Sequence, residues 1–311
     1  TLLIKSASNP KNEWNILLSW LFAQQKDYGK AFVQEKALFE RNPADNSQLF
    51  RLGKIAFNSQ DFQAANKIYN FLNDNTFIRE EKIEANLYLA KIAVGSKNPE
   101  AETIFENLFK KYGKNELTIK PQVTYADFLT FQKNEPQQAI EVLEKALEFS
   151  RSKFDKARIK LKLGDVLVFT GKYNKALIYF SQIQTQLKNH SLAQEARYKV
   201  AQTSYFKGDF TWAKAQLKVL KSSTTQLIAN DAVNLFLKIT DNEPVDSIPS
   251  GLMQFAKAEL LSYQNKNQEA ITILKEIITD FKGQPVEDEA LFMQAKLFVK
   301  KGEYQSTSTT K

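Results

Sequence analysis

The sequence predicts an all-α protein, a solenoid of about eight helix-turn-helix units, on three observations. First, an alanine recurs at positions 31, 65, 101, 139, 176 and 213, with gaps of 34, 36, 38, 37 and 37 residues, and such a period is typical of stacked helical pairs. Second, turns that carry an aromatic residue precede several of these alanines, as in Asp61-Phe62 and Gly171-Lys172-Tyr173. Third, 10 Gly and 8 Pro among 311 residues are fewer than strands and β-turns require.

Composition allows a continuous core and excludes several kinds of chemistry. Hydrophobic residues make up 43% of the chain and aromatic residues 12%, mainly Phe and Tyr, which suits packing between helices. The absence of cysteine excludes disulfides, thiolate zinc sites and a cysteine nucleophile. No apolar run reaches the length of about 18 residues that a membrane span needs. The chain begins with Thr1 and not Met, so we expect that a signal segment or longer N-terminal region was removed and that targeting is unreadable.

Along the chain, each unit is expected to hold two antiparallel helices, because apolar residues recur at i, i+3, i+4 and i+7 on both sides of a short turn. Six units are placed at about 12–43, 46–75, 80–113, 118–151, 153–189 and 191–222. The rhythm then breaks, with a helix at about 224–240 that has no clear partner. The predicted organisation is a repeat array at 1–222, an irregular helix with an acidic, proline-bearing loop at 223–250, further units at 251–305 and a disordered tail at 306–311.

Two units carry residues that resemble the tetratricopeptide repeat (TPR), whose pattern is W-x2-L-G-x2-Y…A-x3-F…P. The matching residues are Leu49-x2-Leu52-Gly53-x2-Ala56 with Ala65-x3-Tyr69, and Leu163-Gly164-x2-Leu167 with Ala176-x3-Phe180. The resemblance covers most of the chain and implies a right-handed α-α superhelix with a concave groove that binds protein. No unit has the early Trp, and Glu35 stands where unit one should have a large apolar residue.

Charge is distributed unevenly, although the formal net charge is +8. Residues 151–230 carry 15 Lys and Arg against 4 Asp and Glu, residues 1–150 are neutral, and residues 231–290 sum to −6. One hypothesis is that the basic block binds an extended acidic peptide through first-helix side chains that point into the groove. These candidates are Arg158, Lys162, Tyr198, Lys199, Gln202, Tyr205 and Phe206. The interpretation that the sequence favours is that these lysines only form a solvated, solubilising face.

Earlier units offer further groove candidates, which are Arg51, Lys54, Tyr88, Lys91 and Tyr125. Chaperone-binding members of the family hold a peptide's terminal carboxylate with Lys and Asn, and the matching positions here lack those asparagines, so that activity is not expected. Large aromatic residues at helical spacing are usually core, and we assign Trp20, Phe128 and Trp212 to packing. His190, the only histidine, lies at a turn between units and is interpreted as a solvated or capping residue.

No phosphate-binding glycine loop, nucleophile elbow or EF-hand spacing occurs, so we expect no enzyme activity, no cofactor and no metal. The sequence therefore predicts a non-catalytic scaffold or adaptor for a protein or peptide partner. The segments Leu192–Tyr198 and Val286–Phe292 resemble repeats of bacterial cell-envelope assembly proteins, which favours the envelope or periplasm over the cytoplasm. One alternative is nucleic-acid binding through residues 151–230, which the scarcity of Arg relative to Lys disfavours. Another is that the chain is the interaction domain of a larger enzyme.

Overall fold

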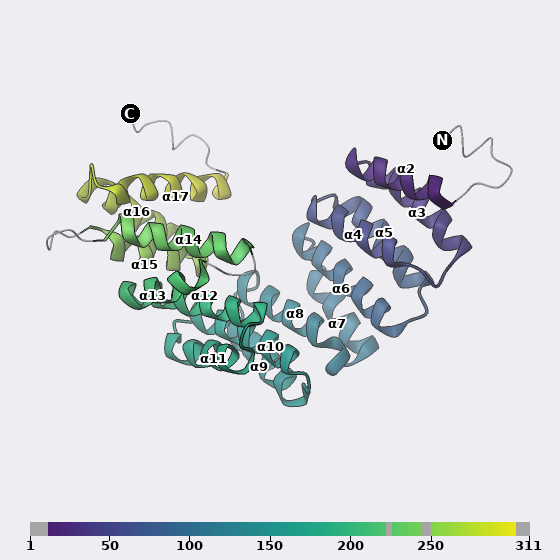
Figure 1. Cartoon of the computed structure of the whole chain (residues 1–311), viewed down its shortest axis with the longest axis horizontal. Helices are drawn as coiled ribbons and strands as arrows, with labels where there is room; N and C mark the ends of the chain where they lie inside the picture. The colour runs from purple at the N-terminus through teal and green to yellow at the C-terminus, as the bar shows by residue number, and fades with distance from the viewer. Residues whose placement is uncertain (1–11, 222–225, 244–249, 303–311) are drawn as a thin grey trace. The chain divides into compact units, whose positions relative to one another are not determined.

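The computed structural model describes residues 12–221, 226–243 and 250–302, and these residues are helical with short connections and no strand (Figure 1). The chain divides into two compact units after Tyr125. The predicted loop residues 244–249 and the predicted tail at 306–311 lie outside the described residues. The all-α repeat fold predicted from the sequence is confirmed over the described ranges.

The first compact unit contains three helical pairs and leads into a helix that crosses the boundary. Its elements are α2 (Asn12–Gln24), α3 (Tyr28–Arg41), α4 (Ser47–Asn58), α5 (Phe62–Asn75), α6 (Arg79–Gly95), α7 (Ala101–Tyr112), the 3-10 turn η1 (Glu116–Thr118) and α8 (Ile119–Phe131).

The second compact unit continues with nine further helices in the described ranges. They are α9 (Pro136–Phe149), α10 (Lys153–Phe169), α11 (Tyr173–Gln186), α12 (Ser191–Phe206), α13 (Phe210–Leu220), α14 (Gln226–Asp241), α15 (Leu252–Tyr263), α16 (Asn267–Asp280) and α17 (Pro285–Lys301). From α9 to α14, and again from α15 to α17, each helix packs against the next one, and α15 also packs on α12, which is the arrangement that stacks one pair on another.

The recurring alanine marks the close crossing of each pair. Ala31, Ala65, Ala139, Ala176, Ala213 and Ala270 are fully buried, and Ala101 nearly so. Four residues later, the second helix carries a buried side chain that fills the space beside the crossing, such as Tyr69, Phe105 or Phe180. Because a small residue lets the backbones approach and a large one fills the remaining gap, this pattern is TPR-like packing.

The turn inside each pair uses one backbone conformation throughout the chain. Gly171 and Gly208 have φ values of 76° and 82°, as expected for left-handed residues that end a helix. At the same place in other pairs stand non-glycine residues with φ between 56° and 62°, which are Lys26, Gln60, Lys97, Asn134 and Asn265. The residue after this position commonly caps the next helix, and the Asp61 carboxylate accepts the backbone N–H of Ala64 at 2.9 Å.

Helix α14 does not follow the two-helix pattern, but its apolar residues pack in a hydrophobic core. Its buried residues Ala232, Leu235 and Ile239 join a cluster with Tyr205 of α12 and Leu217 of α13. Helix α14 therefore packs on the pair before it and contributes a wall to the surface described next.

Two of the packing assignments made for large aromatic residues are wrong. Trp20 and Trp212 are about half exposed, whereas Phe128 is buried as expected. Trp20 lies on the first described helix, and Trp212 is in the first turn of α13 beside buried Ala213, on a face that no described helix covers.

The interpretation of His190 as a capping residue is confirmed, since it is the N-cap of α12 and its Nδ1 accepts the backbone N–H of Leu192 at 3.1 Å.

Candidate partner-binding site

In the first compact unit, three of the predicted site residues meet on α4 and α6. The Nζ atoms of Lys54 and Lys91 lie 5.9 and 4.9 Å from the ring centroid of Tyr88. The Tyr88 ring stacks on that of Tyr69 at a centroid distance of 4.5 Å, and Lys54 forms an ion pair of 3.0 Å with Glu84. This half-buried patch is held together by cation–π and stacking contacts.

Arg51 and Tyr125 do not join this patch. Arg51 is exposed. Tyr125 is buried, its ring packs at 5.1 Å from that of Phe105 and 5.6 Å from that of Phe109, and its hydroxyl donates to Glu102 at 3.3 Å. Tyr125 is therefore part of the packing between helices.

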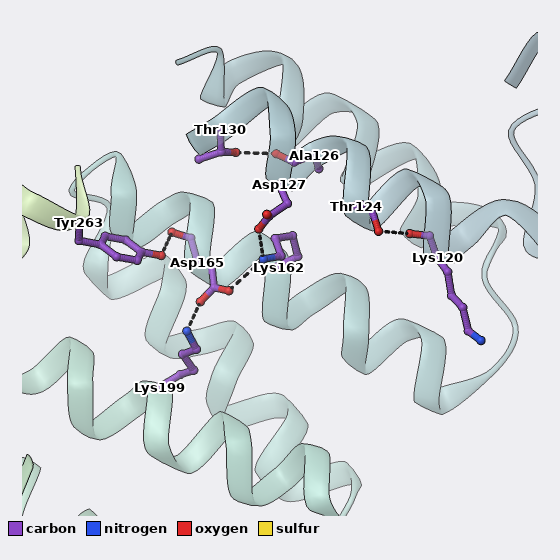
Figure 2. A network of polar contacts seen from close by, with 9 residues as sticks. All are labelled: Lys120, Thr124, Ala126, Asp127, Thr130, Lys162, Asp165, Lys199 and Tyr263. Atoms are coloured by element: carbon purple, nitrogen blue, oxygen red, sulfur yellow. Dashed lines mark hydrogen bonds and ion pairs between the residues drawn. The ribbon is translucent and has the colours of Figure 1, made fainter. Parts of the chain in front are cut away.

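In the second compact unit, the predicted cations of the basic block are ion-paired. Figure 2 shows the Asp165 carboxylate between two lysines, with Oδ2 at 3.4 Å from Lys162 Nζ and Oδ1 at 2.9 Å from Lys199 Nζ. Lys162 also pairs with Asp127. Although desolvation opposes its charge, Asp165 and Asp127 together raise the pKa of Lys162. Arg158, one turn before Lys162 in α10, pairs with Asp155 of the same helix at 2.7 Å.

Helix α15 and the turn after it reach back across the inner helices of this unit. The Tyr263 hydroxyl donates to the backbone carbonyl of Asp165 at 3.2 Å (Figure 2). The side-chain amides of Gln264 and Asn265 donate to the carbonyls of Phe169 at 3.0 Å and Phe131 at 2.8 Å. These bonds join segments 95 to 134 residues apart, so α15 and the turn after it are tied to the backbone of α10 and to the end of α8.

Four predicted residues, Tyr198, Gln202, Tyr205 and Phe206, line a cleft of about 720 Å³ that we call the C-terminal cleft. Its walls come from α12, α14, α15 and α17. The other lining residues are Asp231, Asn234, Leu235, Leu237, Lys238, Asp241, Phe255, Glu259, Ser262, Tyr263, Glu289, Phe292, Met293, Lys296 and Leu297. The structure therefore divides the predicted second-unit set in two, with these four in the cleft and Arg158, Lys162 and Lys199 in ion pairs beside it.

The lining combines aromatic rings with charged groups, of which four are carboxylates and two are lysines. Lys238 pairs with Glu259 at 2.6 Å and lies 5.4 Å from the centroid of Phe255. Lys296 lies 4.0 Å from the centroid of Phe292. The remaining carboxylates are Asp231, Asp241 and Glu289, so the cleft carries an excess of negative charge.

Two tyrosines in the cleft are strongly desolvated. Burial, helped by the negative charges of Asp231 and Glu259, raises the pKa of Tyr198 to about 12. Tyr205 is 1% exposed, and burial likewise raises its pKa well above the ordinary value. The Tyr205 hydroxyl is covered, and the nearby Glu259 carboxylate adds to the rise in its pKa. Both phenols are therefore neutral at physiological pH and can donate or accept hydrogen bonds.

Sequence reasoning missed the walls that α14, α15 and α17 contribute. Asp231 and Glu289 belong to the segment 231–290, whose net charge of −6 was visible in the sequence. From the sequence, part of this charge belongs to the acidic, proline-bearing loop at 223–250, whereas in the structure Asp231 on α14 and Glu289 on α17 line the cleft. The signal that the sequence does contain is that the acidic segment 231–290 directly follows the basic block 151–230.

No protein-family model matches the sequence, and no curated protein matches it significantly. Among solved structures, the chain is similar to PilW, described as a widely conserved type IV pilus biogenesis factor, at 13% identity and a TM-score of 0.41, over 91% of this chain and 100% of that one. It is also similar to the TPR domain of P58(IPK), at 16% identity and a TM-score of 0.32, over 95% of this chain and 90% of that one. The TPR-like character of the repeats is seen in the packing of each buried alanine beside the large side chain four residues later.

None of the helices in the described ranges combines the length and apolar character needed to cross a bilayer.

Proposed function

We propose that the chain is a non-catalytic scaffold that binds an extended segment of a partner protein in the C-terminal cleft. The observation that carries this proposal is the coincidence of an open cleft of about 720 Å³ with a lining of aromatic rings and buried, desolvated hydroxyl groups. Such surfaces, concave and formed by stacked helices, are the usual binding faces of helical-repeat proteins. Aromatic anchors supply most of the binding free energy in interfaces of this kind.

The basic block at 151–230 is a weaker basis for binding. Its candidate cations Arg158, Lys162 and Lys199 are each within ion-pair distance of a carboxylate of this chain. An acidic peptide or a nucleic acid would have to displace those pairs, so neither is part of the proposal. The location in a bacterial envelope stays a prediction from the sequence.

Site-directed photo-crosslinking tests the proposal. Benzoylphenylalanine is placed at Phe292, which lines the cleft and is 62% exposed, and in a matched control at Ile178, which is 58% exposed on α11. In cells of the source organism we expect a discrete adduct from position 292 only, identified by mass spectrometry. The substitution Gln202→Trp, which would fill the cleft, should remove that adduct. Equal adducts at both positions, or none at 292, would contradict the proposal.

A further inference from the structure

We infer that the C-terminal cleft selects a cationic segment, in which an Arg or Lys side chain of the partner enters between the carboxylates of α14 and α17 and the aromatic rings of the cleft. This inference rests on the proposed function and names the chemistry of the partner.

The first observation is uncompensated negative charge on two helices that line the cleft. Asp231 and Asp241 of α14 and Glu289 of α17 form no ion pair among the described residues, whereas Glu259 of α15 is neutralised by Lys238. Lys296 is the single lining cation outside an ion pair in the described ranges, and it lies against the ring of Phe292. A guanidinium or ammonium group would supply the missing positive charge through charge-assisted hydrogen bonds.

The second observation is that the cleft already holds cations against its rings. Lys238 lies over Phe255 and Lys296 over Phe292, at 5.4 and 4.0 Å from the ring centroids. Tyr198 and Phe206 present further half-buried rings of the same lining. Such faces attract a cation and also cover the methylene stem of Arg or Lys.

The third observation concerns the phenol groups of the lining. Tyr198 and Tyr205 both line the cleft, and burial raises the pKa of each, so both are neutral at physiological pH. The Tyr205 hydroxyl is covered and lies near Glu259, whereas Tyr198 is half-buried. A neutral phenol at Tyr198 can accept an N–H of a guanidinium and donate to a backbone carbonyl of a bound segment.

An acidic segment does not fit this lining. Its carboxylates would face Asp231, Asp241 and Glu289, and like charges at short range disfavour binding. The cations predicted to receive such a segment, Lys162 and Lys199, already pair with Asp127 and Asp165.

Two synthetic peptides that differ only in charge test the inference. They are acetyl-Gly-Leu-Arg-Phe-Arg-Leu-Gly-amide and the same peptide with Glu in place of both Arg residues. Binding to the full chain is measured by calorimetry at low salt, and hydrogen exchange locates each peptide. We expect the Arg peptide to protect α12, α14 and α17 and to bind at least tenfold more tightly than the Glu peptide.

Variants separate the cleft from the overall charge of the protein. A double variant, Asp231→Asn with Glu289→Gln, should weaken binding of the Arg peptide about tenfold. The matched control, Glu141→Gln with Glu148→Gln, makes the same charge change at exposed sites on α9 and should leave affinity unchanged. Tyr198→Phe keeps the half-buried ring and removes the hydroxyl, so we expect a several-fold loss of affinity without unfolding, checked by circular dichroism.

Three other outcomes of these experiments would overturn the inference. If the Glu peptide binds the cleft as tightly as the Arg peptide or more tightly, the cationic inference is overturned while the proposed function stands. Failure of both peptides to bind at millimolar concentration also overturns the inference, and the crosslinking at position 292 then decides the proposed function separately. Equal losses of affinity for the Arg peptide in the cleft variant and the α9 control would show that only the net charge of the protein matters, which also overturns the inference.

Discussion

Gly164 of α10 lies directly against the ring of Phe180 of α11, so that a Cβ atom at Gly164 would stand 2.2 Å from Cε1 of Phe180. The same relationship joins Gly53 of α4 to Tyr69 of α5, where the Cβ would be 2.8 Å from Cζ. Real Cβ atoms essentially never approach other atoms this closely. The glycine of the L-G pattern is thus explained by a helix crossing that leaves no room for a side chain.

We predict that Gly164→Ala lowers the free energy of unfolding by about 2 kcal/mol, because overpacking a tight core forces side chains or backbone to move. Urea denaturation measures the loss. Adding Phe180→Leu should recover part of it, since the smaller side chain vacates the space. A Gly164→Ala variant as stable as the parent would show that the crossing is looser than described.

The turns inside the helical pairs give a second prediction. Gln60 has φ of 62°, and a left-handed conformation costs a residue with a Cβ about 1 kcal/mol. Gln60→Gly should therefore raise the free energy of unfolding by about 0.5–1 kcal/mol, measured by urea denaturation.

Gly171→Ala is the converse control. The nearest atom that its Cβ would meet is the Tyr173 hydroxyl at 4.0 Å, and Gly171 has φ of 76°, so only backbone strain is added. We expect a loss of about 1 kcal/mol. If Gln60→Gly raises the free energy of unfolding and Gly171→Ala lowers it, the two turns share the left-handed conformation. Changes of the same sign would contradict that conclusion.

The repeat architecture could be predicted because its determinants are local. Ala65 and Tyr69, or Ala176 and Phe180, lie one helical turn apart, and Gly171 ends one helix just before the next begins. Each of these relationships is contained within one or two helices, so a single sequence displays it.

The site could be predicted only in part because it depends on distant segments. Tyr198, Gln202, Tyr205 and Phe206 share one helix, so the sequence predicts them as a set, but Asp231 and Glu289 reach them only through the packing of α14 and α17. The sequence predicts Lys162 and Lys199 as cations available to a partner, because a net charge does not reveal which carboxylate lies beside which amine. Their partners Asp127 and Asp165 lie on neighbouring helices or one turn away.

The buried carboxyl of Glu35 predicts a pH dependence of stability. Burial raises the pKa of Glu35, against the opposing influence of Ser19 and Arg51. The folded state therefore holds this proton more tightly than the unfolded state, and stability falls as pH rises from the unfolded pKa of about 4.5 through the folded pKa. At neutral pH the charged form is unfavourable.

Glu35→Gln removes that ionisation with little change in shape. We expect it to raise the free energy of unfolding at pH 7 by about 1 kcal/mol and to have less effect at pH 4, where the parent is protonated. Denaturation at the two pH values, with exposed Glu40→Gln as a control, measures the difference. A gain that is the same at both pH values would exclude ionisation as its cause.

The three tryptophans give a direct test of the corrected packing. Trp14, Trp20 and Trp212 are 40%, 51% and 52% exposed. We expect intrinsic fluorescence close to that of tryptophan in water, with efficient quenching by acrylamide, and little change on unfolding. Trp20→Phe and Trp212→Phe should each alter the free energy of unfolding by less than about 0.5 kcal/mol, as surface substitutions do. A blue-shifted, poorly quenched emission would mean that the rings are covered.

The Asp165 carboxylate links Lys162 and Lys199, and its side chain is only 14% exposed. We predict that Asp165→Asn lowers the free energy of unfolding by about 2 kcal/mol, because it leaves a half-buried lysine without its partner and weakens a second pair. Asp155→Asn is the matched control. It removes an ion pair with Arg158, whose side chain is 43% exposed, and exposed pairs contribute at most about 1 kcal/mol. Equal costs for the two variants would show that solvent screens the Asp165 network as fully as a surface pair. Under the described geometry, Lys162→Glu or Lys199→Glu would place a second carboxylate against Asp165 and destabilise the fold, so neutral Lys→Gln variants are the ones to use when partner binding by these lysines is measured.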